Sequence, residues 1–108
     1  MTNPTRVQRY SVAICLSILV VSCAGTSSPY QPAAGTSAKT MFDHACAGCH
    51  GGSAALEAGT GFKVAAGHQS VAFIQAKIAK GGMTMPAFSG LSLAHRTALA
   101  DYLLEHQP

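Results

Sequence analysis

Residues 46–50 read Cys46-Ala47-Gly48-Cys49-His50. Two thiols three positions apart lie about one helical turn apart, so both can bond to the two vinyl groups on one edge of a porphyrin. The histidine that follows then lies over the ring, where an imidazole nitrogen can bind the iron. This spacing predicts one covalently attached haem c, with Cys46 and Cys49 as its thioether attachment points and His50 as the proximal iron ligand.

Three other uses of this cysteine pair fit the sequence less well. A structural zinc site needs two more ligands at matching spacing, and the other histidines are scattered. A thioredoxin-like redox pair needs alternating strands and helices, which the sequence does not show. A structural disulfide would leave the adjacent histidine without a role. We expect three of the other histidines on the surface, namely His44, His95 and His106.

The first 22 residues are predicted to be a signal peptide of the lipoprotein type. Arg6 and Arg9 supply the positive start, and residues 10–21 form an apolar stretch of signal-peptide length. This stretch is shorter than the roughly 20 apolar residues of a transmembrane helix, so we expect export and no membrane-spanning anchor. Export to the bacterial periplasm suits a c-type haem, which is generally attached outside the cytoplasm.

The end of this segment contains a candidate lipidation site. Residues 20–23, Val-Val-Ser-Cys, resemble a bacterial lipobox, in which the cysteine becomes the lipidated first residue of the mature chain. We therefore predict that Cys23 carries a lipid that anchors the protein to the membrane. Residues 22–24 also resemble a site for ordinary signal peptidase, so a soluble periplasmic protein is the alternative. Cys15 would leave with the signal peptide, so no pair of cysteines is left for a disulfide.

The rest of the chain divides into a linker and one domain. Residues 23–36 are small and polar, with two prolines and no periodicity, which is typical of a flexible tether. The domain is predicted to span residues 37–108. A core this small rarely stabilises a fold alone, so a covalently bound porphyrin would complete it.

The predicted fold is all-α, with three main helices wrapped around the haem and no strand. Ser37, Ser70 and Ser92 are candidate N-caps, and glycines at 81 and 82 end the second helix. Residues 51–67 are expected to form a loop with at most a short turn. The side chains that share the buried face of each helix are Met41, Phe42 and Ala45, then Val71, Ile74 and Ile78, and finally Leu99, Tyr102 and Leu103.

The iron needs a second axial ligand, and four side chains are candidates. Met85 precedes Pro86, which restricts the backbone on both sides of their peptide bond, so its thioether lies on a rigid loop. We predict Met85 as the distal ligand, with Met83 as the runner-up and His68 third. Met41 lies too close to the cysteines to reach the opposite face of the ring. An open sixth position is the remaining alternative.

The order of these features resembles the bacterial class I cytochromes c with a single haem and His/Met ligation. The resemblance covers residues 37–107 and includes the run 85–88, Met-Pro-Ala-Phe. It implies that the first and last helices cross near Phe42 and Tyr102, and that one haem edge stays open to partners. In that family a proline-containing loop orients the haem-binding histidine through a carbonyl. Residues 51–69 contain no proline, so the sequence does not indicate which carbonyl orients His50.

These features predict an electron carrier and not an enzyme. Thioether ligation raises the reduction potential of the iron, and two filled axial positions leave no place for a substrate. The protein would pass one electron between a donor and an acceptor protein. Two alternatives stay open. One is a dedicated electron-transfer subunit of a periplasmic dehydrogenase or oxidase complex, and the other is a haem sensor or peroxidase with an open sixth position.

The charge of the chain limits the classes of partner. The formal net charge is +3, of which two charges belong to the signal peptide. No basic stripe remains, so we expect no nucleic-acid partner. Lys77 and Lys80, three residues apart on a predicted helix, are typical of a solvated face, although basic residues near a haem edge would steer acidic partners. We expect a monomer.

Overall fold

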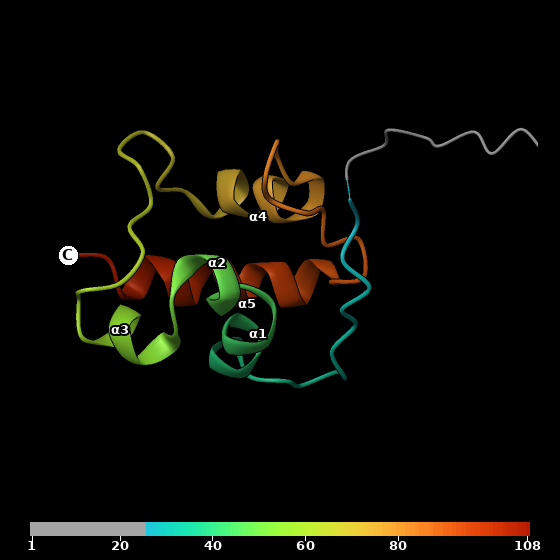
Figure 1. Ribbon diagram of the computed structural model, residues 1–108, viewed down its shortest axis with the longest axis horizontal. Coiled ribbons are helices and arrows are strands. Elements are labelled where there is room, and N and C mark those ends of the chain that lie inside the picture. Colours follow the sequence, from blue (N-terminus) through green and yellow to red (C-terminus); the bar gives the residue numbers. More distant parts are fainter. Residues whose placement is uncertain (1–25) are drawn as a thin grey trace, which may run out of the picture.

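The computed structural model describes residues 26–108, which form a small all-α domain (Figure 1). The only β-type pairing among these residues is an isolated parallel bridge between Ser27 and Ala87. In this part of the chain, no helix is long and apolar enough to cross a membrane. The predicted fold class is confirmed. The helices are α1 (Ala38–Ala45), α2 (Ala47–His50), α3 (Ser53–Glu57), α4 (Val71–Lys80) and α5 (Leu93–Glu105).

Serine N-caps begin the three longest helices, as predicted. The hydroxyl groups of Ser37, Ser70 and Ser92 each accept a hydrogen bond from the backbone N–H three residues later, at 3.1–3.2 Å. Helix α4 ends at Gly81, whose φ of 68° lies in the region that favours glycine. All three predicted helices and their caps are confirmed.

The region 51–67 contains one more helix than the sequence indicated. Helix α3 has no side-chain cap of its own, because its N-cap residue is Gly52. Instead, the Asp43 carboxylate on α1 accepts hydrogen bonds from the backbone N–H of Ser53 at 2.8 Å and from its hydroxyl group at 2.7 Å. The partner that stabilises α3 lies ten residues away in the sequence, so the local pattern did not reveal it.

The core forms where α1 crosses α5. The rings of Phe42 and Tyr102 lie 6.0 Å apart at an angle of 58°, so the implied crossing of the first and last helices is confirmed. Met41, Leu56 and Leu99 are fully buried around this crossing. Helix α4 packs on α5, and α4 with the loop after it lies over the layer formed by α1, α2 and α5 (Figure 1).

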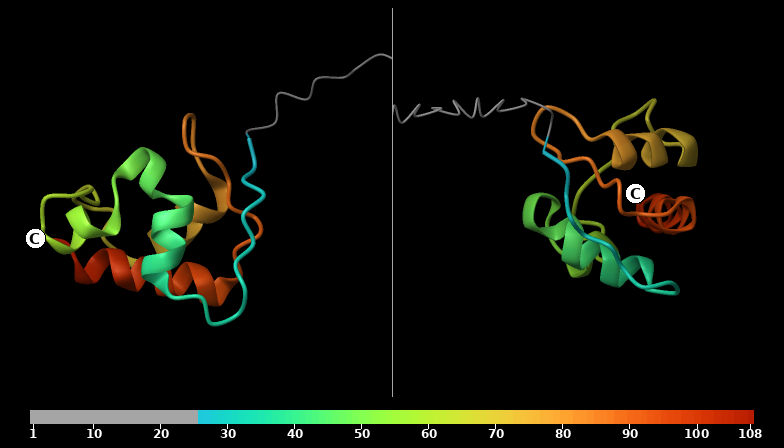
Figure 2. Two further views of the ribbon diagram at one scale, coloured as in Figure 1. Left: turned by 60° about the horizontal axis from the view of Figure 1, so that its bottom comes forward. Right: turned by 90° about the vertical axis from the view of Figure 1, so that its right-hand side faces the viewer.

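The described part of the expected tether lies against the domain. Residues 26–31 run beside the loop that follows α4 in both views of Figure 2. Tyr30 packs against the core and stacks on His44, with 6.2 Å between the ring centroids. This contact differs from the expectation of a free segment. The proposed signal peptide and Cys23 lie outside the described residues, so the division at 22 and 36 stays a prediction.

Candidate haem site

A cavity of about 380 Å³ lies between the two layers of the domain. Its walls come from α1 and α2, from residues 62–68, from α4 and the loop after it, and from α5. Most of the side chains that line it are apolar. It is therefore the kind of largely apolar pocket, with a few polar groups, in which proteins bind small molecules and cofactors.

One wall of the cavity carries two residues of the C-x-x-C-H motif. Cys46 joins the end of α1 to the start of α2, and its carbonyl accepts a hydrogen bond from the N–H of His50 at 2.9 Å. This single turn places Cys46 and His50 on the cavity. Cys49 lies on the same turn but is exposed, and neither cysteine is in a disulfide.

Burial shifts the pKa values of both motif side chains that face the cavity, His50 and Cys46. It lowers the pKa of His50, which favours the neutral imidazole that binds iron. It also raises the pKa of the Cys46 thiol to about 11, and the neighbouring Cys49 adds to this effect. Both residues therefore present uncharged groups to an apolar space near neutral pH.

Phe62 is a site residue that the sequence did not indicate. Its ring lies 4.3 Å from the ring of His50 at an angle of 57°, and it lines the cavity. It is the one aromatic residue between positions 51 and 67, which is the only signal that could have pointed to it.

None of the side-chain hydrogen bonds in residues 26–108 involves the His50 ring. The described residues therefore do not identify a carbonyl that orients this imidazole.

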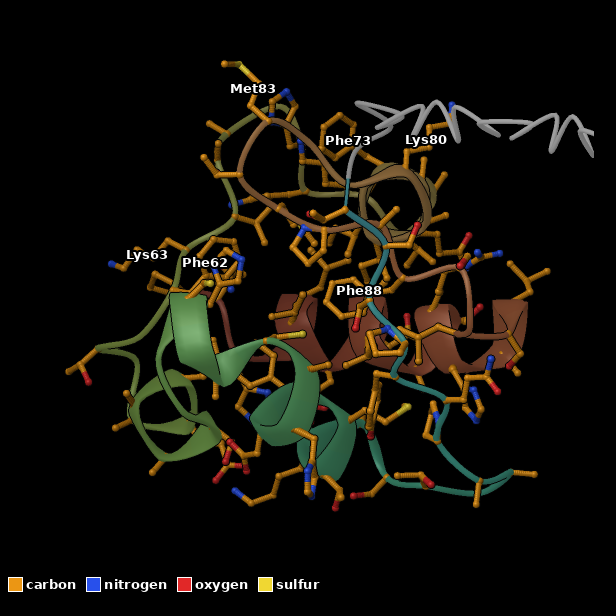
Figure 3. All side chains as sticks on the ribbon, turned by 45° about the vertical axis from the view of Figure 1, so that its right-hand side comes forward. Phe62, Lys63, Phe73, Lys80, Met83 and Phe88 are labelled. Carbon is orange, nitrogen blue, oxygen red and sulfur yellow. The ribbon has the colours of Figure 1, made fainter. Side chains whose placement is uncertain are left out.

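The three candidates for the distal ligand all line the cavity, but in different settings. Met85 is half-buried and packs against the core. Met83 is fully exposed and points away from the domain at the tip of its loop (Figure 3). His68 is exposed and stacks on Phe73, with 4.1 Å between the rings.

The backbone around Met85 is closely held. Its carbonyl accepts a hydrogen bond from the N–H of Gly82 at 2.8 Å. A Cβ atom at Gly81 would lie only 2.5 Å from the same carbonyl and 2.8 Å from the N–H nitrogen of Ala87. Only glycine permits this close approach at a φ of 68°. The end of α4 therefore packs backbone to backbone against the methionine loop, residues 82–91.

The donor set in the cavity fits a covalently attached haem. An imidazole, a thioether and a thiol face one apolar space, and a second thiol lies one turn away; these are the groups that hold c-type haem. Among residues 26–108, no cluster of three or more histidine, cysteine or acidic side chains could hold a bare metal ion. The described residues therefore offer no zinc site of the kind considered from the sequence.

Comparison with protein families identifies the chain. Residues 33–103 match the family model described as cytochrome c oxidase, cbb3-type, subunit III. The chain belongs to this cytochrome c family. Comparisons with curated proteins and with solved structures gave no significant match. Membership implies a covalent haem c, for which Cys46 and Cys49 are present, and an electron-transfer role that is typically non-catalytic.

The charges of the cytochrome c domain are unevenly placed around the cavity. Lys63 and Lys77 line it, and Lys80 lies beside Lys77 in a shallow groove on α4. No carboxylate lines the cavity. The acidic residues are on α1, α3 and α5, namely Asp43, Glu57, Asp101 and Glu105. The side of the domain that holds the cavity therefore has a basic rim.

A polar network ties α1, α3 and α5 together away from the cavity. Glu57 forms a salt bridge with Lys39 at 2.7 Å and accepts a hydrogen bond from the Tyr102 hydroxyl group at 2.9 Å. These bonds, that of Lys39 first, lower the pKa of Glu57. Burial, followed by the bond to Glu57, raises the pKa of Tyr102 to about 12.

Proposed function

We propose that this cytochrome c domain carries one electron between a donor and an acceptor protein in the bacterial periplasm. Cys46 and Cys49 would attach the haem, and His50 and Met85 would bind its iron. The observation that carries the proposal is that Cys46, His50 and Met85 line one apolar cavity. When bound, the haem supplies a centre that gains and loses one electron.

The chain's own residues account for transfer without catalysis. Burial keeps the imidazole of His50 neutral and ready to bind iron. The apolar walls, including Phe42 and Leu99, would shield a bound haem from water. With His50 and Met85 both bound to the iron, no place on the metal would be left for a substrate.

Met85 is favoured over the other candidates by its packing. Its side chain already lies against the core, and its backbone is fixed by Gly81 and Gly82. Met83 would have to turn from solvent into the cavity, which means ordering a side chain that is free. His68 would have to give up its stacking on Phe73.

Carbon monoxide binding tests the ligand assignment. Met85→Ala should keep the covalent haem, lower the reduction potential and bind carbon monoxide readily in the ferrous state. The wild type should bind it poorly. The matched control is Met83→Ala, which removes the same side chain from the same loop and should behave like the wild type. If Met83→Ala opens the site and Met85→Ala does not, the assignment is wrong by two residues. If the wild type itself binds carbon monoxide readily, that result would support the alternative of a haem sensor or peroxidase with an open sixth position.

A second candidate function is an electron-transfer subunit of an oxidase complex. The description of the matching family, which names a subunit of a cytochrome c oxidase, favours it. The basic rim of Lys63, Lys77 and Lys80 suits an acidic partner surface in either case. Purification from detergent-solubilised membranes separates the two. A free carrier should elute alone at the size of a monomer, whereas a subunit should co-elute with an oxidase in fixed ratio.

We also propose that a lipid on Cys23 anchors the protein to the membrane. The resemblance of residues 20–23 to a lipobox supports this. The carbonyl of Thr26 accepts a hydrogen bond from the N–H of Ala87, which binds it to the domain, and three residues of chain span at most about 10 Å. An anchor at Cys23 would therefore hold the domain close to the membrane surface.

Cell fractionation tests the anchor. Wild-type protein should sediment with membranes and be released by detergent but not by salt. Cys23→Ala should give an unprocessed or soluble form. Cys15→Ala, a control within the apolar stretch of the signal, should leave the distribution unchanged. Wild-type protein found wholly in the soluble periplasmic fraction would support cleavage by ordinary signal peptidase.

A further inference from the structure

The segment before α1 is bound to the loop that carries Met85. The N–H of Ser28 donates to the carbonyl of Ala87 at 2.8 Å, and the N–H of Ala87 donates to the carbonyl of Thr26 at 3.0 Å. Both polar groups of the Ala87 backbone are thus paired with a segment almost sixty residues away in the sequence. Ala87 is two residues after Met85, so this pairing fixes the backbone close to the methionine.

Further contacts hold the segment in place at Tyr30 and Gln31, which follow this bridge. Tyr30 packs against the core and stacks on His44 of α1. Further along, Gly90 leaves no room for a side chain: a Cβ atom there would lie 2.7 Å from the carbonyl oxygen of Tyr30 and 2.6 Å from Cγ of Gln31. The segment therefore touches the methionine loop at Ala87 and again at Gly90, and it is tied to α1 between these contacts.

The methionine loop has little regular structure of its own to hold it. Between the end of α4 and the start of α5, no helix forms. Two backbone hydrogen bonds lie inside the loop, from the N–H of Gly82 to the carbonyl of Met85 and from the N–H of Leu91 to the carbonyl of Phe88. Residues 82–91 are attached to other segments by a hydrogen bond from the N–H of Phe88 to the carbonyl of Ile78 at 3.0 Å and by the bridge to Thr26 and Ser28. The bridge thus supplies two of these three attaching hydrogen bonds.

We propose that residues 26–31 form a strap that positions the methionine loop, and so keeps the thioether of Met85 directed at the sixth iron position. The proposal rests on Met85 being the distal ligand. None of the strap residues lines the cavity. Its residues are positioning residues, and loosening them should expose the iron without releasing the haem.

Replacing Ser28 tests the strap, because the N–H of Ser28 donates the strap's hydrogen bond to the carbonyl of Ala87. Ser28→Pro removes the N–H that bonds Ala87, whereas Ser28→Ala keeps it. Both variants lose the hydroxyl group, which accepts a hydrogen bond from the Tyr30 N–H inside the strap at 3.3 Å, so their comparison isolates the bond to Ala87. Net loss of one hydrogen bond weakens a closed state about 2- to 10-fold. In the haem-loaded protein, Ser28→Pro should therefore raise the carbon monoxide association rate about 2- to 10-fold. It should also speed hydrogen exchange at the Ala87 amide. Ser28→Ala keeps the bond to Ala87 and should stay closer to the wild type than Ser28→Pro in both measurements; equal behaviour of the two variants would show that the bond to Ala87 has no role.

A second variant acts from the loop side of the same contact. Gly90→Ala would push Cβ into the backbone of Tyr30 and should displace the strap, with the same rise in carbon monoxide rate. Gly52→Ala is its matched control, because the nearest atom to that Cβ atom is an Asp43 carboxylate oxygen at 3.8 Å. It should leave the rate unchanged.

The outcomes separate the strap from the ligand assignment. If Met85→Ala opens the site but Ser28→Pro and Gly90→Ala bind carbon monoxide as slowly as the wild type, the strap has no positioning role and the proposed function stands. If Met85→Ala leaves the site closed, the ligand assignment fails, and the strap proposal fails with it. A rise in rate in Gly52→Ala equal to that in Gly90→Ala would also overturn the strap, because it would mark a general loss of packing.

Discussion

The two sides of the cavity are built in different ways. On the His50 side, two helices joined at Cys46 present the motif within five residues of chain. On the Met85 side, a loop is held by backbone hydrogen bonds to residues as distant as Thr26 and Ser28. The first side depends on local sequence and on side-chain packing between helices. The second depends on contacts between segments that are far apart along the chain, so small changes in backbone position should matter more there.

The largest expected effect is a loss of stability when core packing is removed from the helices on the His50 side of the cavity. Met41 is fully buried in α1 but does not line the cavity, so Met41→Ala removes core contacts without touching the haem site. It should lower the free energy of unfolding of the haem-loaded protein by about 2–5 kcal/mol. Met83→Ala makes the same chemical change at a fully exposed position and should change it by less than about 0.5 kcal/mol. Equal stability of the two variants in denaturant titrations would contradict the position of the core.

A smaller effect on stability should follow from a steric clash on the Met85 side of the cavity. Gly81→Ala combines an unfavourable positive φ with a clash against the Met85 carbonyl. Gly67 has a φ of 84° and open space around it. Gly67→Ala therefore imposes only the unfavourable positive φ, which lowers the free energy of unfolding by about 1–2 kcal/mol. Thermal unfolding should show Gly81→Ala to be the less stable, and only this variant should bind carbon monoxide faster than the wild type. If the two variants behave alike, the close packing of α4 against the methionine loop does not hold in solution.

The smallest effect concerns pH and the polar network of α1, α3 and α5. The hydrogen bond from Lys39, then that from Tyr102, holds the pKa of Glu57 below its ordinary value of 4.5. The folded protein therefore binds this proton less readily than the unfolded chain. The stabilisation is complete above that value and is lost as the pH falls through the lower folded-state pKa. Glu57→Gln should weaken the acid dependence of the unfolding midpoint between neutral pH and the acid range. An unchanged dependence would show that the network is not formed.

The same contrast explains how much the sequence predicted. The serine caps and the faces of the three main helices follow from short-range patterns, and the structure confirms them. The crossing at Phe42 and Tyr102, which the family resemblance implied, is confirmed as well. Helix α3 was missed because its stabilising carboxylate, Asp43, lies on another helix. No local pattern pointed to the stacking of Phe62 on His50 or to the bridge at Ala87.

The difference applies to the candidate site as well. The motif names Cys46, Cys49 and His50 because its chemistry needs them close together in the sequence. The distal ligand has no such constraint, so Met85 and Met83 could be ranked from the sequence only by their neighbours, Pro86 after Met85 and Gly82 before Met83. The burial of Met85 against the core, and the exposure of Met83, are properties of the folded loop.

Covalent attachment of haem at Cys46 and Cys49 is the central claim, and it can be tested on a denaturing gel. The exported protein from cells with an intact haem-maturation system should be denatured, separated and stained for haem peroxidase activity. A haem-stained band at the size of the mature chain, lost when Cys46 and Cys49 are both replaced by alanine, is the expected result. A wild-type band that is present by protein stain but carries no haem would contradict the account.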